Sequence, residues 1–328
     1  MIGRRTFNSA ILSLLAVPLE MIRSAQAKDY PVKPVSIITR APAGVGPDVI
    51  ARTLAGQLSQ IWDQQVLVIN KPGAGGLIGL RAAAEAPVDG YSLYLPLSST
   101  FVALPERIHT LPLDLKRDLA PIALIGEQPM VITANAKIGI DTMQKLVAYA
   151  KKHPRKFTYG ANQGSLPHLT GELLKERTGI DLTFAPYSNM RQAMQDAVGG
   201  TIQVYIESIA GVGGQIKAGA LRGLAVASSH RLSDHPEIPT VREALPSIGA
   251  FEARGWFALM AHAGVPQNIL RRVAVDVETV LMQPMVLQRF NALGTYVRPM
   301  SPTQLAAFIR SEETLWRPIV RRVLHVAG

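Results

Sequence analysis

Residues 39–48 read Thr39-Arg40-Ala41-Pro42-Ala43-Gly44-Val45-Gly46-Pro47-Asp48. The β-branched run 35–39 predicts a buried strand, and the apolar residues at 50, 54, 58 and 61 predict a helix face after the glycines. The first N–H groups of a helix have no internal partner, and the helix dipole adds partial positive charge there. This strand–turn–helix unit therefore predicts an anion site, which could hold a carboxylate or a phosphate.

The alternation of strands and helices continues beyond this unit. Residues 65–69 and 91–97 read as strands, and residues 78–85 read as the helix between them. This order predicts a parallel sheet with right-handed crossovers, and ligands bind such sheets at the carboxyl ends of the strands. Ser98, Ser99 and Thr100 follow the third strand, so we expect them to lie near the glycine loop.

A second block repeats the pattern. The expected helices and strands are 141–152 with Asp141 as N-cap, 157–160, 168–178, 182–185, 190–198, 202–206, 213–218 and 221–227. Runs 124–133 and 251–261 read as strands that cross between the blocks, and helices at 268–281, 284–293 and 303–323 complete the first block. The sequence thus predicts two α/β lobes with a cleft between them: residues 28–129 and 253–328 form lobe 1, and residues 130–252 form lobe 2.

The first 27 residues have the pattern of an export signal. Arg4-Arg5 precede the apolar run 10–17, and Ala25-Gln26-Ala27 forms a small-x-small cleavage site. The Arg-Arg-x-Phe pattern also resembles a twin-arginine signal, so both export routes stay open. An uncleaved N-terminal anchor is the alternative. After Ala27, no apolar run reaches the roughly 18 residues of a membrane span.

Composition excludes several classes of function. The formal charge is +10, but the basic residues are dispersed and lack the aromatic interleaving of RNA-binding surfaces, so we expect small anions rather than nucleic acid as partners. The chain has no cysteine, which excludes disulfides and thiolate chemistry. Its seven histidines have no metal-ligand spacing, so we expect no metal and no cofactor.

Catalytic and nucleotide motifs are incomplete. Gly44-Val45-Gly46 lacks a third glycine, and Asn70 stands where a dinucleotide fold has an acidic residue. The loop Gly73–Gly76 lacks the Lys-Ser/Thr of a P-loop, and Ser165 lacks the G-x-S-x-G elbow. We therefore expect a binding protein rather than an enzyme.

Seven candidate positions have a structural and a functional interpretation. Asp48, expected at N2 of its helix after Pro47 at N1, either stabilises the helix start and loop or contacts a ligand. His168 either orders its loop or contacts the ligand, and residues 98–100 either cap a helix or bind. Tyr187 is either core or presents its hydroxyl to the cleft, and Glu207 is either a solvated strand end or a cleft group.

The chain resembles a known family, the periplasmic solute-binding receptors of tripartite tricarboxylate transporters, also called Bug proteins. The resemblance covers essentially all of the chain from Tyr30 onward. The motifs that carry it are Ala41-Pro42-Ala43-Gly44…Asp48, Asn70-Lys71-Pro72-Gly73-Ala74-Gly75-Gly76…Gly79, Asp89-Gly90-Tyr91, Tyr159-Gly160…Pro167-His168-Leu169…Gly171-Glu172-Leu173, Pro186-Tyr187, Lys217-Ala218-Gly219…Leu221-Arg222 and Ile238-Pro239-Thr240-Val241.

The resemblance implies a two-lobed periplasmic-binding-protein (Venus-flytrap) fold, with a mostly parallel sheet flanked by helices in each lobe and two crossing strands as hinge. It implies capture of a small organic carboxylate (a di- or tricarboxylate, an acidic amino acid or an aromatic acid), delivery to a membrane permease, no catalysis, a periplasmic location and a monomer. The candidate ligand-binding residues are Pro42, Ala43, Gly44, Val45, Gly46, Asp48, Ser98, Ser99, Thr100, Ala161, Asn162, Gly164, Ser165, His168, Tyr187, Glu207 and Ser208.

The chain departs from the family pattern near the anion loop. Val45 stands where glycine is usual, Pro47 replaces Thr or Ser, and Arg40 replaces Pro. Arg40 is either a solvent-facing strand end or a ligand contact. A ligand-dependent sensor that docks a membrane signalling receptor is the alternative function, because its pocket would be the same and only its outer surface would differ.

Overall fold

The computed structural model describes residues 30–108 and 110–325. The predicted export signal lies outside these residues. The strands are β1 (Val35–Thr39), β2 (Val66–Asn70), β3 (Ser92–Leu95), β4 (Leu119–Asn135), β5 (Thr158–Ala161), β6 (Thr183–Pro186), β7 (Val204–Ser208), β8 (Leu221–Val226) and β9 (Arg254–His262).

Helices follow most of the strands. They are α2 (Gly46–Trp62), η1 (Ala74–Gly76), α3 (Leu77–Ala84), α4 (Ser99–Val102), α5 (Leu104–Arg107), η2 (Ala136–Ile138), α6 (Met143–Lys152), α7 (Leu166–Thr178), α8 (Met190–Gly199), α9 (Ile209–Lys217), α10 (Val241–Ala244), η3 (Pro246–Ile248), α11 (Gln267–Leu281), α12 (Pro284–Asn291) and α13 (Pro302–His325).

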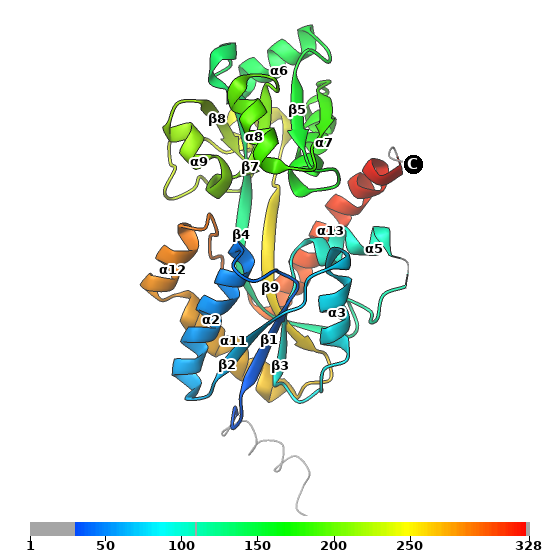
Figure 1. The fold of residues 1–328 in the computed structure, drawn as a ribbon, viewed down its shortest axis with the longest axis vertical. Coiled ribbons are helices and arrows are strands. Elements are labelled where there is room, and N and C mark those ends of the chain that lie inside the picture. The colour runs from blue at the N-terminus through cyan, green and yellow to red at the C-terminus, as the bar shows by residue number, and fades with distance from the viewer. Residues whose placement is uncertain (1–29, 109, 326–328) are drawn as a thin grey trace, which may run out of the picture.

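The chain forms two α/β lobes connected by the long strand β4 (Figure 1). In lobe 1 the strand order is β2-β1-β3-β9-β4, and in lobe 2 β4 pairs β8 and also begins the series β4-β7-β5-β6. Strand β4 pairs β9 from Leu119 to Pro129, and from Met130 onward it pairs β7 and β8. Because both halves of β4 find partners, this strand is longer than the predicted 124–133.

Parallel pairing is confined to the part of each sheet away from β4. Strands β1, β2 and β3 are parallel to one another, and β5 is parallel to β6 and β7. The pairs that include β4 or β9 are antiparallel. The strands β1, β3, β5 and β7 therefore deliver their carboxyl-terminal loops to the space between the lobes, as Figure 1 shows.

Helix α2 shows how the sequence pattern becomes packing. Ile50, Leu54 and Leu58 are fully buried against the sheet, as their four-residue spacing predicts. The indole of Trp62 at the end of the helix donates to Asp276 of α11 at 2.7 Å. The predicted end of α7 at Gly179 is confirmed, since this glycine has a φ of 70°.

Three local predictions were wrong. Helix α6 begins at Met143 with Thr142 as N-cap, and Asp141 instead pairs with Lys145 at 2.8 Å. Helix α2 begins at Gly46, so Pro47 is at N2 and Asp48 at N3, because the turn is one residue shorter than predicted. Helix α9 begins directly after Ser208, four residues before the predicted start, because β7 continues without a loop into it.

Candidate functional site

A cavity of about 380 Å³ lies between the two lobes. Lobe 1 contributes Arg40 at the end of β1, the η1 turn and the α4–α5 segment, and lobe 2 contributes the β5–α7 loop. A volume of this size is within the range of small-molecule sites. The cavity brings together four of the sequence-predicted residues, which are Ser99, Asn162, Gly164 and Ser165.

Ser165 presents an unsatisfied polar group at this cavity. It is the N-cap of the thirteen-residue helix α7, in extended conformation at ψ 164°, and its side chain makes no capping bond. Its hydroxyl oxygen is buried and has no hydrogen-bond partner among the described residues. A buried hydroxyl without a partner costs free energy, so the cavity offers a bound polar group a ready donor beside a helix N-terminus.

His168 orders the β5–α7 loop. Its Nδ1 accepts a hydrogen bond from the Gly164 N–H at 3.0 Å, and its ring stacks on Phe184 with centroids 3.6 Å apart. Burial lowers the pKa of His168 to about 4. The neutral ring therefore carries its proton on Nε2, and this geometry favours the loop-ordering interpretation over direct ligand contact.

The glycine loop before α2 is held by Asp48. The Asp48 carboxylate is 1% exposed and accepts from the Gly44 N–H at 2.8 Å, from Asn70 Nδ2 at 2.7 Å and from Arg52 Nε at 2.9 Å. Burial acts to raise the pKa of Asp48, but the hydrogen bonds from Arg52, Asn70 and Gly44 hold it below its usual range. Asp48 thus closes the loop on itself, which is the structural interpretation of the residue.

The exposed part of this loop lies apart from the 380 Å³ cavity. Pro42, Ala43, Gly44 and Val45 are exposed, Gly46 is half-buried, and none of them lines the cavity. Figure 1 shows the N-terminal end of α2 pointing toward lobe 2 beside the crossing strands. The loop therefore lies on the side of lobe 1 that faces lobe 2 (Figure 1).

The remaining predicted residues end or follow strands, and none of them lines the cavity. Ser98 is the N-cap of α4 and donates its N–H to the Trp256 carbonyl at 3.0 Å, and Thr100 is fully buried. Ala161 is buried at the end of β5. The Tyr187 hydroxyl donates to Asp196 of α8 at 2.7 Å, so it is engaged within lobe 2.

Glu207 and Ser208 end β7 beside the crossing strand. Glu207 pairs with Val131 of β4, and its carboxylate accepts from the Ser208 N–H at 2.8 Å. Burial raises the pKa of Glu207. The side chain packs against Gly211, where an added Cβ would lie 2.4 Å from Glu207 Cγ, so it is held against α9 and does not line the cavity.

Two arginines line the cavity, and one of them was not identified from the sequence. Arg40, noted there as a departure from the family, donates from Nη1 to Ser99 Oγ at 2.5 Å. Arg107 was not predicted. Ser99 of α4, Ala103 between the helices and Arg107 of α5 all line the cavity, and no single helix face joins them, so the sequence pattern carried no clear signal for Arg107.

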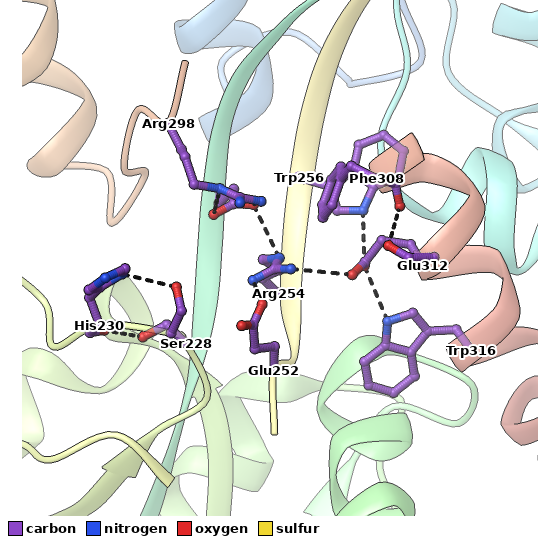
Figure 2. Close-up of polar contacts among 12 residues, drawn as sticks. Ser228, His230, Glu252, Arg254, Trp256, Arg298, Phe308, Glu312 and Trp316 are labelled. Carbon is purple, nitrogen blue, oxygen red and sulfur yellow. Dashed lines mark hydrogen bonds and ion pairs between the residues drawn. The ribbon is translucent and has the colours of Figure 1, made fainter. Parts of the chain in front are cut away.

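A buried charge network lies where the chain crosses between lobes. Arg254 forms ion pairs with Glu127 of β4, with Glu252 and with Glu312 of α13, and Arg298 also pairs with Glu127 (Figure 2). The network connects β4, β9 and α13. It lies at the residue pair Pro129–Arg254, which is the last pair between β4 and β9 before the chain enters lobe 2.

Glu312 is the buried acid of this network. It accepts from the indoles of Trp256 and Trp316, each at 3.2 Å, as Figure 2 shows. Burial raises the pKa of Glu312 to about 7, and the charge of Arg254 opposes that rise. The hinge region therefore contains a carboxyl group that titrates near neutral pH.

The described residues contain no group of three or more His, Asp or Glu side chains arranged to hold a metal ion. None of the helices described has both the length and the apolar character required to cross a bilayer.

Comparisons with known proteins agree with this architecture. The family model for the tripartite tricarboxylate transporter family receptor matches residues 50–324. The chain is 33% identical to protein BugT of Bordetella pertussis over 314 residues, which cover 95% of this chain and 96% of BugT.

Two solved structures are similar over most of the chain. A TctC solute-binding protein from Polaromonas has a TM-score of 0.80 at 24% identity, with 89% of this chain and 99% of that chain covered. MatC from Rhodopseudomonas palustris, solved with bound malate, has a TM-score of 0.68 at 26% identity, with 89% of this chain and 100% of that chain covered.

Proposed function

Because the chain belongs to the tripartite tricarboxylate transporter receptor family, whose members are periplasmic solute-binding receptors and not enzymes, we propose that it captures a small organic carboxylate between its lobes. The observation that carries the proposal is the chemistry of the interlobe cavity. Its polar lining consists of two arginines and neutral donors, and it includes neither Asp nor Glu. Such a lining favours an anion and disfavours a cation.

Binding proceeds by capture between two walls. The carboxylate accepts a hydrogen bond from the Ser165 hydroxyl, which is otherwise without a partner among the described residues, and lies beside the positive end of the α7 dipole. The glycine loop Pro42–Gly46 and the start of α4 at Ser98 and Ser99 approach the solute from lobe 1 as the lobes close, and the buried Thr100 supports that segment. Closure excludes water and strengthens each charge-assisted bond.

Neighbouring positions support the proposed site from behind. Asp48 and His168 hold their loops, and Ala161, Tyr187, Glu207 and Ser208 belong to the lobe-2 framework without lining the cavity. MatC, which is similar over 89% of this chain, was solved with bound malate, so malate is the first solute to test.

The family name also suggests the partner. We propose that the solute-loaded protein, exported to the periplasm and monomeric, docks a membrane permease of the tripartite tricarboxylate type. Pull-down from membrane fractions, with and without solute, distinguishes this from a sensor role: recovery of the permease supports transport, and recovery of a signalling receptor instead contradicts it.

A thermal-shift panel tests solute binding. Purified protein starting near Lys28 should gain about 2.7 kcal/mol of unfolding free energy at a solute concentration one hundred times its Kd. The panel contains malate, other di- and tricarboxylates, acidic amino acids and aromatic acids, and neutral sugars serve as controls. Stabilisation by a neutral solute with none by any carboxylate would overturn the proposal. Mass spectrometry of solute carried through purification provides an independent identification.

A further inference from the structure

Arg40 is built into the lobe-1 wall of the cavity. Its aliphatic stem packs against the η1 turn so closely that a Cβ on Gly76 would lie 2.8 Å from Arg40 Cδ. Its Nη1 donates to Ser99 Oγ at 2.5 Å, which orients the guanidinium along the cavity wall. A guanidinium has five N–H donors, so most of them remain for a ligand.

Arg107 reaches across the cavity from the end of α5. Its Nη2 lies 2.5 Å from the position that a Cβ on Gly164 would occupy, so the guanidinium lies against the β5–α7 loop of lobe 2. Gly164 has a φ of +71°, a left-handed conformation that glycine adopts without strain. The absence of a side chain at Gly164 thus makes room for the Arg107 side chain between the lobes.

The two charges are uncompensated. Among the described residues, no carboxylate forms an ion pair with Arg40 or Arg107, and the cavity lining contains no acidic side chain. Glu106, next to Arg107 in the sequence, is instead engaged by Arg321 at 2.6 Å and by Arg317 at 3.8 Å. Burial and the positive charge of Arg107 both lower the pKa of Arg40.

Arg40 is half-buried and Arg107 is exposed, and two like charges that line one cavity repel each other. An anion placed between them relieves the repulsion and satisfies the free donors at the same time. A neutral or singly charged solute compensates this charge less completely than a solute with two anionic groups.

We propose that Arg40 and Arg107 are the specificity-determining residues of the cleft and select solutes with two or more anionic groups over monoanions. This inference rests on the proposed function, because it assumes that the interlobe cleft is the solute site. One carboxylate binds at the Ser165 end beside the N-terminus of α7, and the second binds the guanidinium pair.

Matched pairs of solutes test the selection directly. Each pair has one carbon skeleton with and without its second carboxylate: malate and 3-hydroxybutyrate, succinate and butyrate, glutarate and pentanoate, and phthalate and benzoate. Isothermal titration should give the wild-type protein a preference of at least about 100-fold for the dicarboxylate of the pair that binds, about tenfold for each guanidinium.

Substitution to methionine removes the charge and keeps the aliphatic stem. Arg40→Met and Arg107→Met should each reduce the preference about tenfold while the affinity for the monocarboxylate stays nearly constant, and the double variant should bind both members about equally. Arg271→Met, on an exposed position of α11 outside the cavity, is the matched control and should leave the preference unchanged.

The outcomes separate this inference from the proposed function. Equal wild-type binding of the two members, or an unchanged preference in both arginine variants, overturns the arginine selection and leaves carboxylate capture intact. Failure of every carboxylate to bind overturns both. If Arg40→Met does not fold, Arg107→Met at the exposed end of α5 decides the question, with Arg40→Lys as the charge-preserving variant that should retain the preference.

Discussion

Replacement of Asp48 by alanine tests how the glycine loop Pro42–Gly46 is held in place. The carboxylate is 1% exposed and accepts two bonds inside the loop region, from the Gly44 N–H and from Asn70 Nδ2. A hydrogen bond to a charged group contributes about 1.5–3 kcal/mol. The Arg52 side chain is 52% exposed, so its ion pair adds at most about 0.5 kcal/mol. We expect Asp48→Ala to lower the unfolding free energy by about 3–4 kcal/mol through loss of these hydrogen bonds. The loss stays at the lower end of their sum because removal of the buried carboxylate also removes its desolvation cost.

Urea unfolding at pH 7 measures this loss, with intrinsic tryptophan fluorescence as the signal, since Trp62 lies at the far end of the same helix. Arg52→Ala is the matched control and should cost less than about 1 kcal/mol. Malate titration should show weaker binding for Asp48→Ala, because the freed Gly44 N–H lets the loop change shape.

Asp48→Asn isolates the charge through its pH dependence. The native pKa of Asp48 is below its usual value, so the carboxylate stabilises the native state above the unfolded pKa of about 3.9. That contribution is lost as the pH falls through the lower native pKa, so the difference between wild type and Asp48→Asn should be constant near neutrality and shrink in acid. A loss below about 1 kcal/mol in Asp48→Ala together with abolished solute binding would refute this reasoning and favour direct ligand contact.

Three further predictions concern the hinge and lobe 2. Burial raises the pKa of Glu312 to about 7, so the native state of the wild type should lose unfolding free energy as the pH rises from about 4.5 to 7. Urea unfolding at several pH values should show that Glu312→Gln removes up to about 3 kcal/mol of this pH dependence of stability. An unchanged pH profile in Glu312→Gln would contradict the prediction. The contribution of His168 to stability depends on pH in the opposite direction, because its pKa of about 4 lies below the value in the unfolded chain. The unfolding free energy of the wild type should therefore fall as the pH drops from about 6.5 toward 4. His168→Gln should reduce that decline in the same urea titration. Gly171→Ala should lower the unfolding free energy by about 1–3 kcal/mol, because the new Cβ would lie 2.4 Å from Cε2 of the buried Tyr159. Gly199→Ala is the control, because no atom lies within 4 Å of its new Cβ. Equal effects of the two substitutions in thermal unfolding would refute the steric explanation.

Local patterns predicted most of the helices and strands of this protein, although several of their ends differ. The strand at 35–39 matches β1, the four-residue apolar spacing matches the buried face of α2, and Gly179 ends α7, because each depends on residues within a few positions of one another. The alternation of strands and helices in two blocks also predicted the two-lobed α/β fold and the direction in which the strands deliver their loops. The family motifs extended this to a receptor rather than an enzyme.

Tertiary packing decided which groups act together. Asp48 is engaged by Asn70, 22 residues away, and Glu127 by Arg298, 171 residues away, so the loop lock and the hinge network have no local signature. The cavity places Arg40 of lobe 1, Arg107 of α5 and Gly164 of lobe 2 around one space, because the strands cross between lobes at a fixed register. The sequence by itself thus predicted an anion site at the strand ends, through its helix starts and small residues. The distribution of charge in the cavity depends on distances between side chains that are far apart in the sequence. Only the folded arrangement of the two lobes sets those distances.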